Sequence, residues 1–373
     1  MTTFAARRTR RAPLLLPVLL AIASLAPSCR RGGGGEAGGG GAPAAPIDPG
    51  QALYNSGKYA EALPLLEQSA AQGRTGTLLY EIGYAKGASD AAHVDEKKRL
   101  WAEAEPLLAQ EVASPGGATL DRYYYLTVIN SDQGDGDKVA EYAHQAVNQI
   151  EMGPDAGKLG GEDWFRLGRL HEFLNEASES EAAYRRAVSA FRDHPAANPS
   201  YQALALAAVG SRDFEARRFK DAAAEFDQAL TLSPGLGHVK PYLHGIALLA
   251  ADRYNDAATA FMKDRDPETM TDAQYGADLA RKSQEAGGLE ANDTDGVPLE
   301  SLTGDQLDSR IREAAQAFRD VRAKNSWKPG DPLSAEIVPA QKRFCALLRE
   351  KLVQDRWLQE FCLREKIADI LRR

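Results

Sequence analysis

The residue types that most often carry enzyme chemistry occur in this sequence, but not at the spacings that such chemistry needs. None of the six histidines belongs to an H-x-x-x-H pair, and none has cysteine or paired carboxylates at metal-ligand spacing. The sequence has no G-x-x-x-x-G-K-[ST] phosphate loop and no G-x-S-x-G nucleophile elbow. We therefore expect no catalytic residue, no metal site and no cofactor, and we expect the many Asp and Glu side chains on solvated helix faces.

Cys29 is the cysteine best placed for a covalent modification. A basic stretch and the apolar residues 14–26 precede Pro27, Ser28 and Cys29. Basic, apolar and small residues in this order predict an export signal over residues 1–28. Because an apolar run of this length covers only about 20 Å of a roughly 30 Å hydrocarbon core, we do not expect a permanent membrane span.

The residues around Cys29 resemble the lipobox of bacterial lipoproteins, in which the cysteine thiol takes a diacylglycerol. In that family leucine usually stands three places before the cysteine, whereas here Leu25 stands four places before it. The resemblance implies that Cys29 is acylated. Residues 29–48, rich in Gly, Ala and Pro, are then expected to form a flexible tether. The alternatives are an ordinary signal peptide with an incidental cysteine and a twin-arginine signal at residues 9–14.

The other two cysteines, Cys345 and Cys362, form a candidate disulfide in an exported protein. On one continuous helix they would lie about 25 Å apart, too far for a bridge. A helical hairpin that turns near Val353-Gln354 would bring them face to face. The absence of Gly or Pro between Leu347 and Leu358 favours an unbroken helix instead. Two buried free thiols, or an antiparallel dimer bridged between chains, are the alternatives to the hairpin.

From Pro49 to Gly287 the sequence repeats a pattern of large and small residues. One copy starts with Trp164 and Leu167-Gly168, has a polar turn at Asn175-Glu176, and continues with Tyr184. Five further copies share the frame wholly or in part. They start near residues 57, 79, 120, 203 and 238. Polar residues 88–99 are expected to displace the second half of the copy that starts near residue 79.

This pattern resembles the tetratricopeptide repeat, which forms two antiparallel helices. The resemblance implies an all-α fold, a right-handed α-solenoid of tetratricopeptide-type helix pairs. A helical period near 3.6 dominates and no run alternates with period two, so we expect almost no strand. Small residues such as Gly168, Gly210 and Gly245 are expected to let the first helix of a pair lie close to the second.

The domain organisation follows from these signals. We expect a repeat array over residues 49–286 with about six units, the first two irregular. A linker at 287–300 and a C-terminal helical region at 301–373 follow. In that region we expect one helix over Gly304–Lys324 and a long helical pattern over Pro339–Leu371, which together cover the open end of the solenoid as a C-terminal helical cap.

In the family, five places in the first helix of each repeat face a concave groove that holds a peptide or helix of a partner. The matching positions here are mostly aromatic, and buried aromatic side chains anchor helix-in-groove binding. These candidate groove residues are Tyr80, Tyr84, Tyr124, Val128, Phe165, Arg169, Phe173, Phe214, Tyr242, Ile246 and Leu249. Alternatively, these side chains pack against the chain's own C-terminal helices and belong to the core.

The net charge of −8 is unevenly distributed. Residues 32–300 carry 24 basic and 42 acidic side chains, whereas residues 301–373 carry 15 basic and 11 acidic ones. Residues 32–300 are therefore strongly acidic and repel the phosphate backbone of nucleic acids. This charge argues against nucleic-acid binding and allows a basic protein partner.

Together these features predict a non-catalytic interaction scaffold, exported and lipid-anchored at a bacterial envelope, periplasm-facing or on the surface. Its expected partners are other envelope proteins, basic ones included, and the membrane through the lipid anchor. The alternative is an envelope enzyme or glycan-binding protein with its site in the C-terminal region and the repeats as support.

Overall fold

The computed structural model confirms that the protein is all-α. It describes residues 48–152, 159–196, 198–234, 239–289, 292, 295–328, 331–356, 358 and 370. The predicted export signal, Cys29, nearly all of the tether, and Cys362 lie outside these residues. Within them, the only extended pairing is an isolated bridge between Asn292 and Pro298.

The described helices belong to two compact units, one ending at Ala205 and the other starting at Leu206. The division falls inside one helix of the repeat region, where the sequence predicts a continuous array. Unit 1 contains α1 (Pro49–Asn55), α2 (Tyr59–Gln72), α3 (Gly76–Ser89), α4 (Val94–Ala113), α5 (Leu120–Gln133), α6 (Gly136–Glu151), α7 (Gly161–Phe173) and α8 (Ala177–Asp193). Helix α9 (Pro199–Glu215) spans the division. Unit 2 continues with α10 (Phe219–Leu232), α11 (Pro241–Ala250), α12 (Tyr254–Met262), α13 (Met270–Glu285), α14 (Gly304–Lys324) and α15 (Ile337–Asp355).

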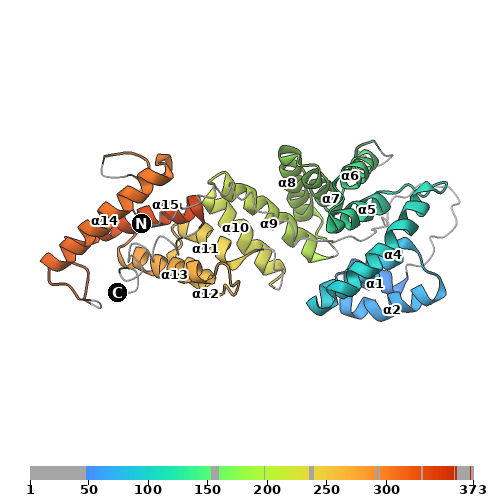
Figure 1. The fold of residues 1–373 in the computed structure, drawn as a ribbon, viewed down its shortest axis with the longest axis horizontal. Helices are drawn as coiled ribbons and strands as arrows, with labels where there is room; N and C mark the ends of the chain where they lie inside the picture. The colour runs from blue at the N-terminus through green and yellow to red at the C-terminus, as the bar shows by residue number, and fades with distance from the viewer. Residues whose placement is uncertain are drawn as a thin grey trace, which may run out of the picture. The chain divides into compact units, whose positions relative to one another are not determined.

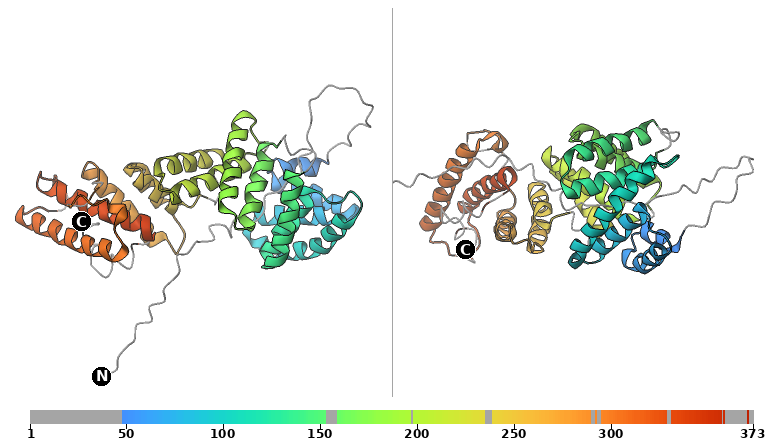
Figure 2. Two further views of the ribbon diagram at one scale, coloured as in Figure 1. Left: turned by 90° about the horizontal axis from the view of Figure 1, so that it is seen from above. Right: turned by 45° about the vertical axis from the view of Figure 1, so that its right-hand side comes forward.

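Most consecutive helices pack against each other within each unit, and α15 packs against both α14 and α13 (Figure 1 and Figure 2). The most extensive packing is within the pairs α3/α4, α5/α6 and α7/α8 of unit 1, whereas in unit 2 α12 packs about equally against α11 and α13. This arrangement of adjacent helices is compatible with an α-solenoid, as the repeat pattern predicts.

The same turn joins the two helices of five pairs. Each turn contains a residue with positive φ two places before the second helix, and the next backbone N–H donates to the carbonyl five residues earlier, as in a Schellman motif. These positive-φ residues are Gly57, Gly134, Asn175, Arg217 and Asp252. Helix α13 ends in the same way at Gly287, although no second helix follows directly.

A glycine of the first helix faces a ring of the second helix in four pairs, which is why the two helices approach closely. A Cβ at Gly168 would lie 2.7 Å from the Tyr184 ring, and one at Gly245 would lie 2.6 Å from the Phe261 ring. Gly83 faces Trp101 and Gly210 faces Phe226 in the same way. The expected role of Gly168, Gly210 and Gly245 in close helix packing is therefore seen directly.

Two helix boundaries differ from the predictions. Helix α4 begins at Val94, so most of the polar residues 88–99 are helical rather than inserted. Lys97 explains part of this, because its ammonium pairs with Asp132 at 3.1 Å and lies 4.1 Å from the Trp101 ring centroid. Helix α15 ends at Asp355, where Arg356 adopts a left-handed conformation (φ 53°). The unbroken helix over Pro339–Leu371 is therefore wrong.

Candidate functional site

The predicted groove residues lie on the first helices of the pairs. Within each unit we call the surface that these helices form its first-helix face: α3, α5 and α7 form it in unit 1, and α11 and α13 with the end of α9 form it in unit 2. Of the eleven candidates, Phe173 is half-buried and the other ten are buried. In this structure the ten therefore belong to packed layers and do not line an open groove. What covers them differs between the two units.

In unit 1, other aromatic side chains of the same unit cover the first-helix face. The Tyr80 ring stacks between Trp101 and Tyr125, with centroid distances of 5.2 and 4.1 Å. Tyr84 contacts the rings of Tyr54 and Tyr59, which belong to α1 and α2. The aromatic stripe predicted from the sequence is therefore largely core in this unit.

The start and the end of unit 1 also meet. The Asn198 side-chain amide, just before α9, donates to the Tyr59 hydroxyl at 3.3 Å and lies against Gly57. Phe165 contacts the Tyr201 ring at 5.5 Å between centroids. The Asn198–Tyr59 hydrogen bond joins residues 139 positions apart, so the first pair packs against the segment that begins α9.

Charged groups are buried among these rings. Glu81 is 1% exposed, and its Oε1 accepts hydrogen bonds from Gln51 at 2.9 Å and from the Tyr125 hydroxyl at 3.4 Å. Burial raises the pKa of Glu81 to about 8, because the neutral acid is easier to desolvate than the carboxylate; the nearby Asp121 carboxylate acts in the same direction. Glu81 is therefore largely protonated at neutral pH.

Arg169, a candidate groove residue, is held by local contacts. Its guanidinium pairs with Glu172 at 2.7 Å and lies 4.9 Å from the Phe173 ring centroid. Its neighbour Arg166, also buried, pairs with Asp121 at 3.0 Å. Both guanidinium groups thus neutralise carboxylates inside unit 1.

In unit 2, helix α15 covers the first-helix face. It packs against α11 and α13 (Figure 1). The Tyr242 hydroxyl donates to the Arg356 carbonyl at 2.9 Å, and the Arg356 guanidinium lies 5.1 Å from the Phe214 ring centroid. Near the other end of α15, the Gln341 amide donates to the Lys282 carbonyl at 2.9 Å. The contacts of α15 thus extend over three successive first helices, α9, α11 and α13.

Ion pairs from two successive turns hold the same stretch of α15. Arg217 pairs with Glu350 at 2.8 Å, and Asp252 pairs with Arg349 at 3.4 Å. Arg217 and Asp252 occupy equivalent turn positions with positive φ, which ordinarily favour glycine. None of these four residues stands out in the repeat pattern. The signal that could have found them is the recurrence of a charged residue where a repeat turn needs a left-handed conformation.

Burial and charge affect two further groups on this face. The pKa of the Tyr242 hydroxyl is raised by burial and by the carboxylates of Asp272 and Asp264, so it stays a hydrogen-bond donor. The Asp272 carboxylate accepts from the Leu358 backbone N–H at 2.5 Å, which fixes the chain just past α15.

Cys345, one of the two candidate disulfide residues, is a buried free cysteine on α15. Burial raises the pKa of its thiol to about 12, against the effect of the nearby Lys282. Because Cys362 lies outside the described residues, the pairing of the two stays a prediction.

Two features of the described residues concern metal binding and membrane crossing. Among the described residues, no group of three or more His, Cys, Asp or Glu side chains could hold a metal ion. None of the described helices is long and apolar enough to cross a membrane.

No protein-family model matches this chain, and no curated protein sequence matches it.

Proposed function

We propose that this protein is a non-catalytic interaction scaffold that holds a helix of a partner protein on its first-helix face. The observation that carries the proposal is the path of α15 across α9, α11 and α13 in unit 2. A face that holds one helix through aromatic contacts and edge ion pairs has the properties needed to hold another. In this proposal α15 is the intramolecular occupant, and a partner helix takes its place.

The repeated turns support assignment to the tetratricopeptide type. Five pairs share one Schellman turn, and four share a glycine-to-ring contact between their helices. In the proposed architecture the pairs form a right-handed solenoid, and α14 and α15 cover its C-terminal end. Such stacked pairs offer an extended face to a partner.

The proposed location is the bacterial envelope, with Cys29 acylated and residues 29–48 as a tether. A diacylglyceryl group plus an amide-linked chain holds a protein to a bilayer more stably than one chain alone. Residues 32–300 carry 24 basic and 42 acidic side chains. This negative charge favours basic partners among the envelope proteins.

Photocrosslinking in the native cell tests this function. A photoreactive phenylalanine derivative is placed at Phe173 or Arg217, at the edge of the first-helix face. Matched controls place it at Met152 and Met262, which are 82% and 65% exposed and lie at the ends of second helices. The proposal predicts discrete protein adducts at the first two positions and none at the controls. Equal adducts at all four positions, or none at any, would contradict it.

A further inference from the structure

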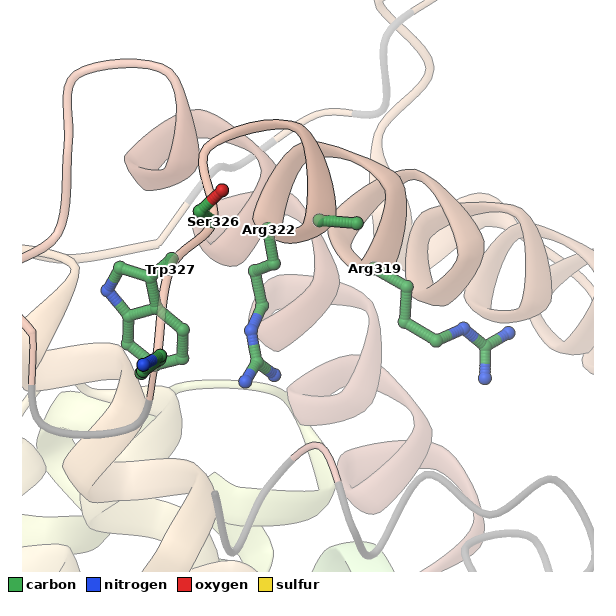
Figure 3. Close-up of a pocket in the computed structure, with 6 residues that line it drawn as sticks. Arg319, Arg322, Ser326 and Trp327 are labelled. Carbon is green, nitrogen blue, oxygen red and sulfur yellow. The ribbon is translucent and has the colours of Figure 1, made fainter.

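An open hollow lies where α14 ends, and it is lined by basic and aromatic side chains. It has a volume of about 410 Å³. The lining residues are Arg319, Arg322, Ala323, Ser326, Trp327 and Lys328. Figure 3 shows Arg319 and Arg322 extending from α14 to the same side, with the Trp327 indole beside Arg322. The hollow is separate from the first-helix face described above.

The Arg322 guanidinium is positioned by two rings. It lies 5.4 Å from the Phe318 ring centroid and 4.3 Å from the Trp327 ring centroid. Phe318 is itself 3% exposed and stacks on Phe344 of α15. A guanidinium held over aromatic rings loses less conformational entropy when it binds an anion, because its orientation is already restricted.

The loop that carries Trp327 is also fixed. Trp327 donates its indole N–H to the Asp331 carbonyl at 3.0 Å, and its backbone N–H donates to the Arg322 carbonyl at 3.1 Å. Ser326, between helix and indole, has a positive φ of 50°, a conformation that a non-glycine residue adopts at some energetic cost. The Asp331 carboxylate accepts from the Lys328 backbone N–H at 2.8 Å.

Two of the cationic side chains that line the hollow form no ion pair with a described residue. Arg319 donates to the neutral Gln316 amide at 2.9 Å, and Lys328 has no carboxylate partner among the described residues. Lys324, on the same helix end but outside the hollow, pairs with Glu336 at 3.2 Å. Three cationic side chains and no carboxylate therefore line the hollow.

We propose that this hollow binds a phosphate group, with Trp327 packing on the part of the ligand beside it. Planar guanidinium groups match the oxygen geometry of phosphate, and Arg319 and Arg322 supply two of them from one helix face. The indole offers a flat apolar surface next to the charge. The phosphate can belong to a soluble ester or to a lipid headgroup, which present the same chemistry. This inference does not depend on the proposed scaffold function.

Cations near a helix C-terminus also stabilise the helix dipole, a role that needs no ligand. The experiment must therefore measure binding separately from stability. Lys324→Gln is the matched control, because it removes one positive charge from the same helix end outside the hollow.

The test uses the full chain carrying Cys29→Ser, so that a lipid anchor cannot bring it to membranes. Isothermal titration with glycerol 3-phosphate, and with glycerol as the uncharged control, measures soluble binding. Sedimentation with phosphatidylglycerol vesicles, compared with phosphatidylcholine vesicles, measures lipid binding. Thermal unfolding of each variant shows that it is folded.

We expect binding of glycerol 3-phosphate but not of glycerol. Arg319→Gln and Arg322→Gln should each weaken it about tenfold, the usual effect of losing one charge-assisted hydrogen bond. Arg322→Lys should retain only part of the affinity, and Lys324→Gln should stay near wild type. Sedimentation with phosphatidylglycerol vesicles that Arg319→Gln abolishes would identify a lipid headgroup as the source. No binding to either probe, or an equal loss in Lys324→Gln, would overturn the proposal. Because Arg319 is exposed and its hydrogen bond to Gln316 lies within α14, its variant stays informative even if Arg322→Gln does not fold.

Discussion

Arg217 and Glu350 lie 133 residues apart in the sequence and form an ion pair of 2.8 Å in unit 2. The Glu350 side chain is 3% exposed, whereas that of Arg217 is 35% exposed. The pair joins the turn after α9 to the middle of α15, and Gln354 donates a second hydrogen bond to Glu350 at 2.9 Å. A buried carboxylate is stable only with such partners, so Arg217 is expected to fix α15 on the first-helix face.

Replacing Arg217 should therefore destabilise unit 2. Arg217→Ala removes the cation from a carboxylate that stays buried, and we expect a loss of about 1–3 kcal/mol in the free energy of unfolding. The control is Arg212→Ala near the end of α9, which removes an exposed pair with Glu215 and should cost less than about 0.5 kcal/mol. Denaturant unfolding of both variants measures the difference in the free energy of unfolding. Equal losses would mean that the ion pair of Arg217 with Glu350 stabilises unit 2 no more than an exposed ion pair does.

Glu81 should make the stability of unit 1 depend on pH. Its pKa of about 8 in the folded protein exceeds its ordinary value of 4.5. Stability is therefore full below pH 4.5, falls as pH rises toward 8, and levels off above that value. The slope is at most about 1.4 kcal/mol per pH unit. Glu81→Gln, which places a neutral amide of the same shape beside Gln51 and Tyr125 and cannot ionise, should be more stable than wild type at pH 7 by a few kcal/mol.

Unfolding free energies at pH 5 and pH 8 check this prediction. The wild-type value should decrease between these pH values relative to that of Glu81→Gln. Parallel pH profiles for the two proteins would show that Glu81 is ionised in the fold.

Gly245 should tolerate no side chain. A Cβ there would lie 2.6 Å from the Phe261 ring, which also lies against Gly276 and is 2% exposed. Gly245→Ala should cost about 1–3 kcal/mol through overpacking, more than the gain in helix propensity of about 1 kcal/mol. Gly136→Ala is the matched control, because nothing lies within 4 Å of its Cβ position. A melting temperature that rises in both variants would contradict the close packing described for α11 and α12.

Much of this fold could be predicted from local patterns. The repeat frames place helices at α5 to α12, and the helix predicted over Gly304–Lys324 has the bounds of α14. No Gly or Pro marks the end of α15, where Arg356 adopts the left-handed conformation instead; only the hairpin considered for the two cysteines has a turn close to this point, near Val353-Gln354. That conformation accompanies the contacts of Arg356 with Tyr242 and Phe214, which join distant parts of the sequence.

The candidate site was predictable only in part, for a similar reason. The repeat pattern assigns Tyr80 and Tyr242 to first helices, where the structure has them. It carries no information on what covers them, because the covering groups are Tyr125 of another pair and the end of α15. Which groups pack on these two tyrosines depends on how successive helix pairs stack and on where the C-terminal helices pack. The spacing of residues within one repeat encodes neither.

The lipid anchor can be tested by replacing its acceptor. Cys29→Ser removes the thiol on which a diacylglycerol would be placed, and the protein should move from the membrane fraction to the soluble fraction. A matched control, Cys345→Ser, alters a cysteine buried on α15 and should leave the membrane fraction unchanged. Equal membrane retention of the wild type and Cys29→Ser would exclude acylation as the anchor.

The central claim is that the first-helix face of unit 2 binds a helix, at present α15. Its most direct test is hydrogen exchange on a chain ending at Gly288, with and without a synthetic peptide of residues 337–358 added in trans. The account predicts that removing α15 speeds amide exchange in α11 and α13 but not in α5 and α7, and that the peptide restores the protection. The account is contradicted if amide exchange in α11 and α13 is unchanged after truncation. It is also contradicted if the peptide does not slow the exchange that truncation has increased.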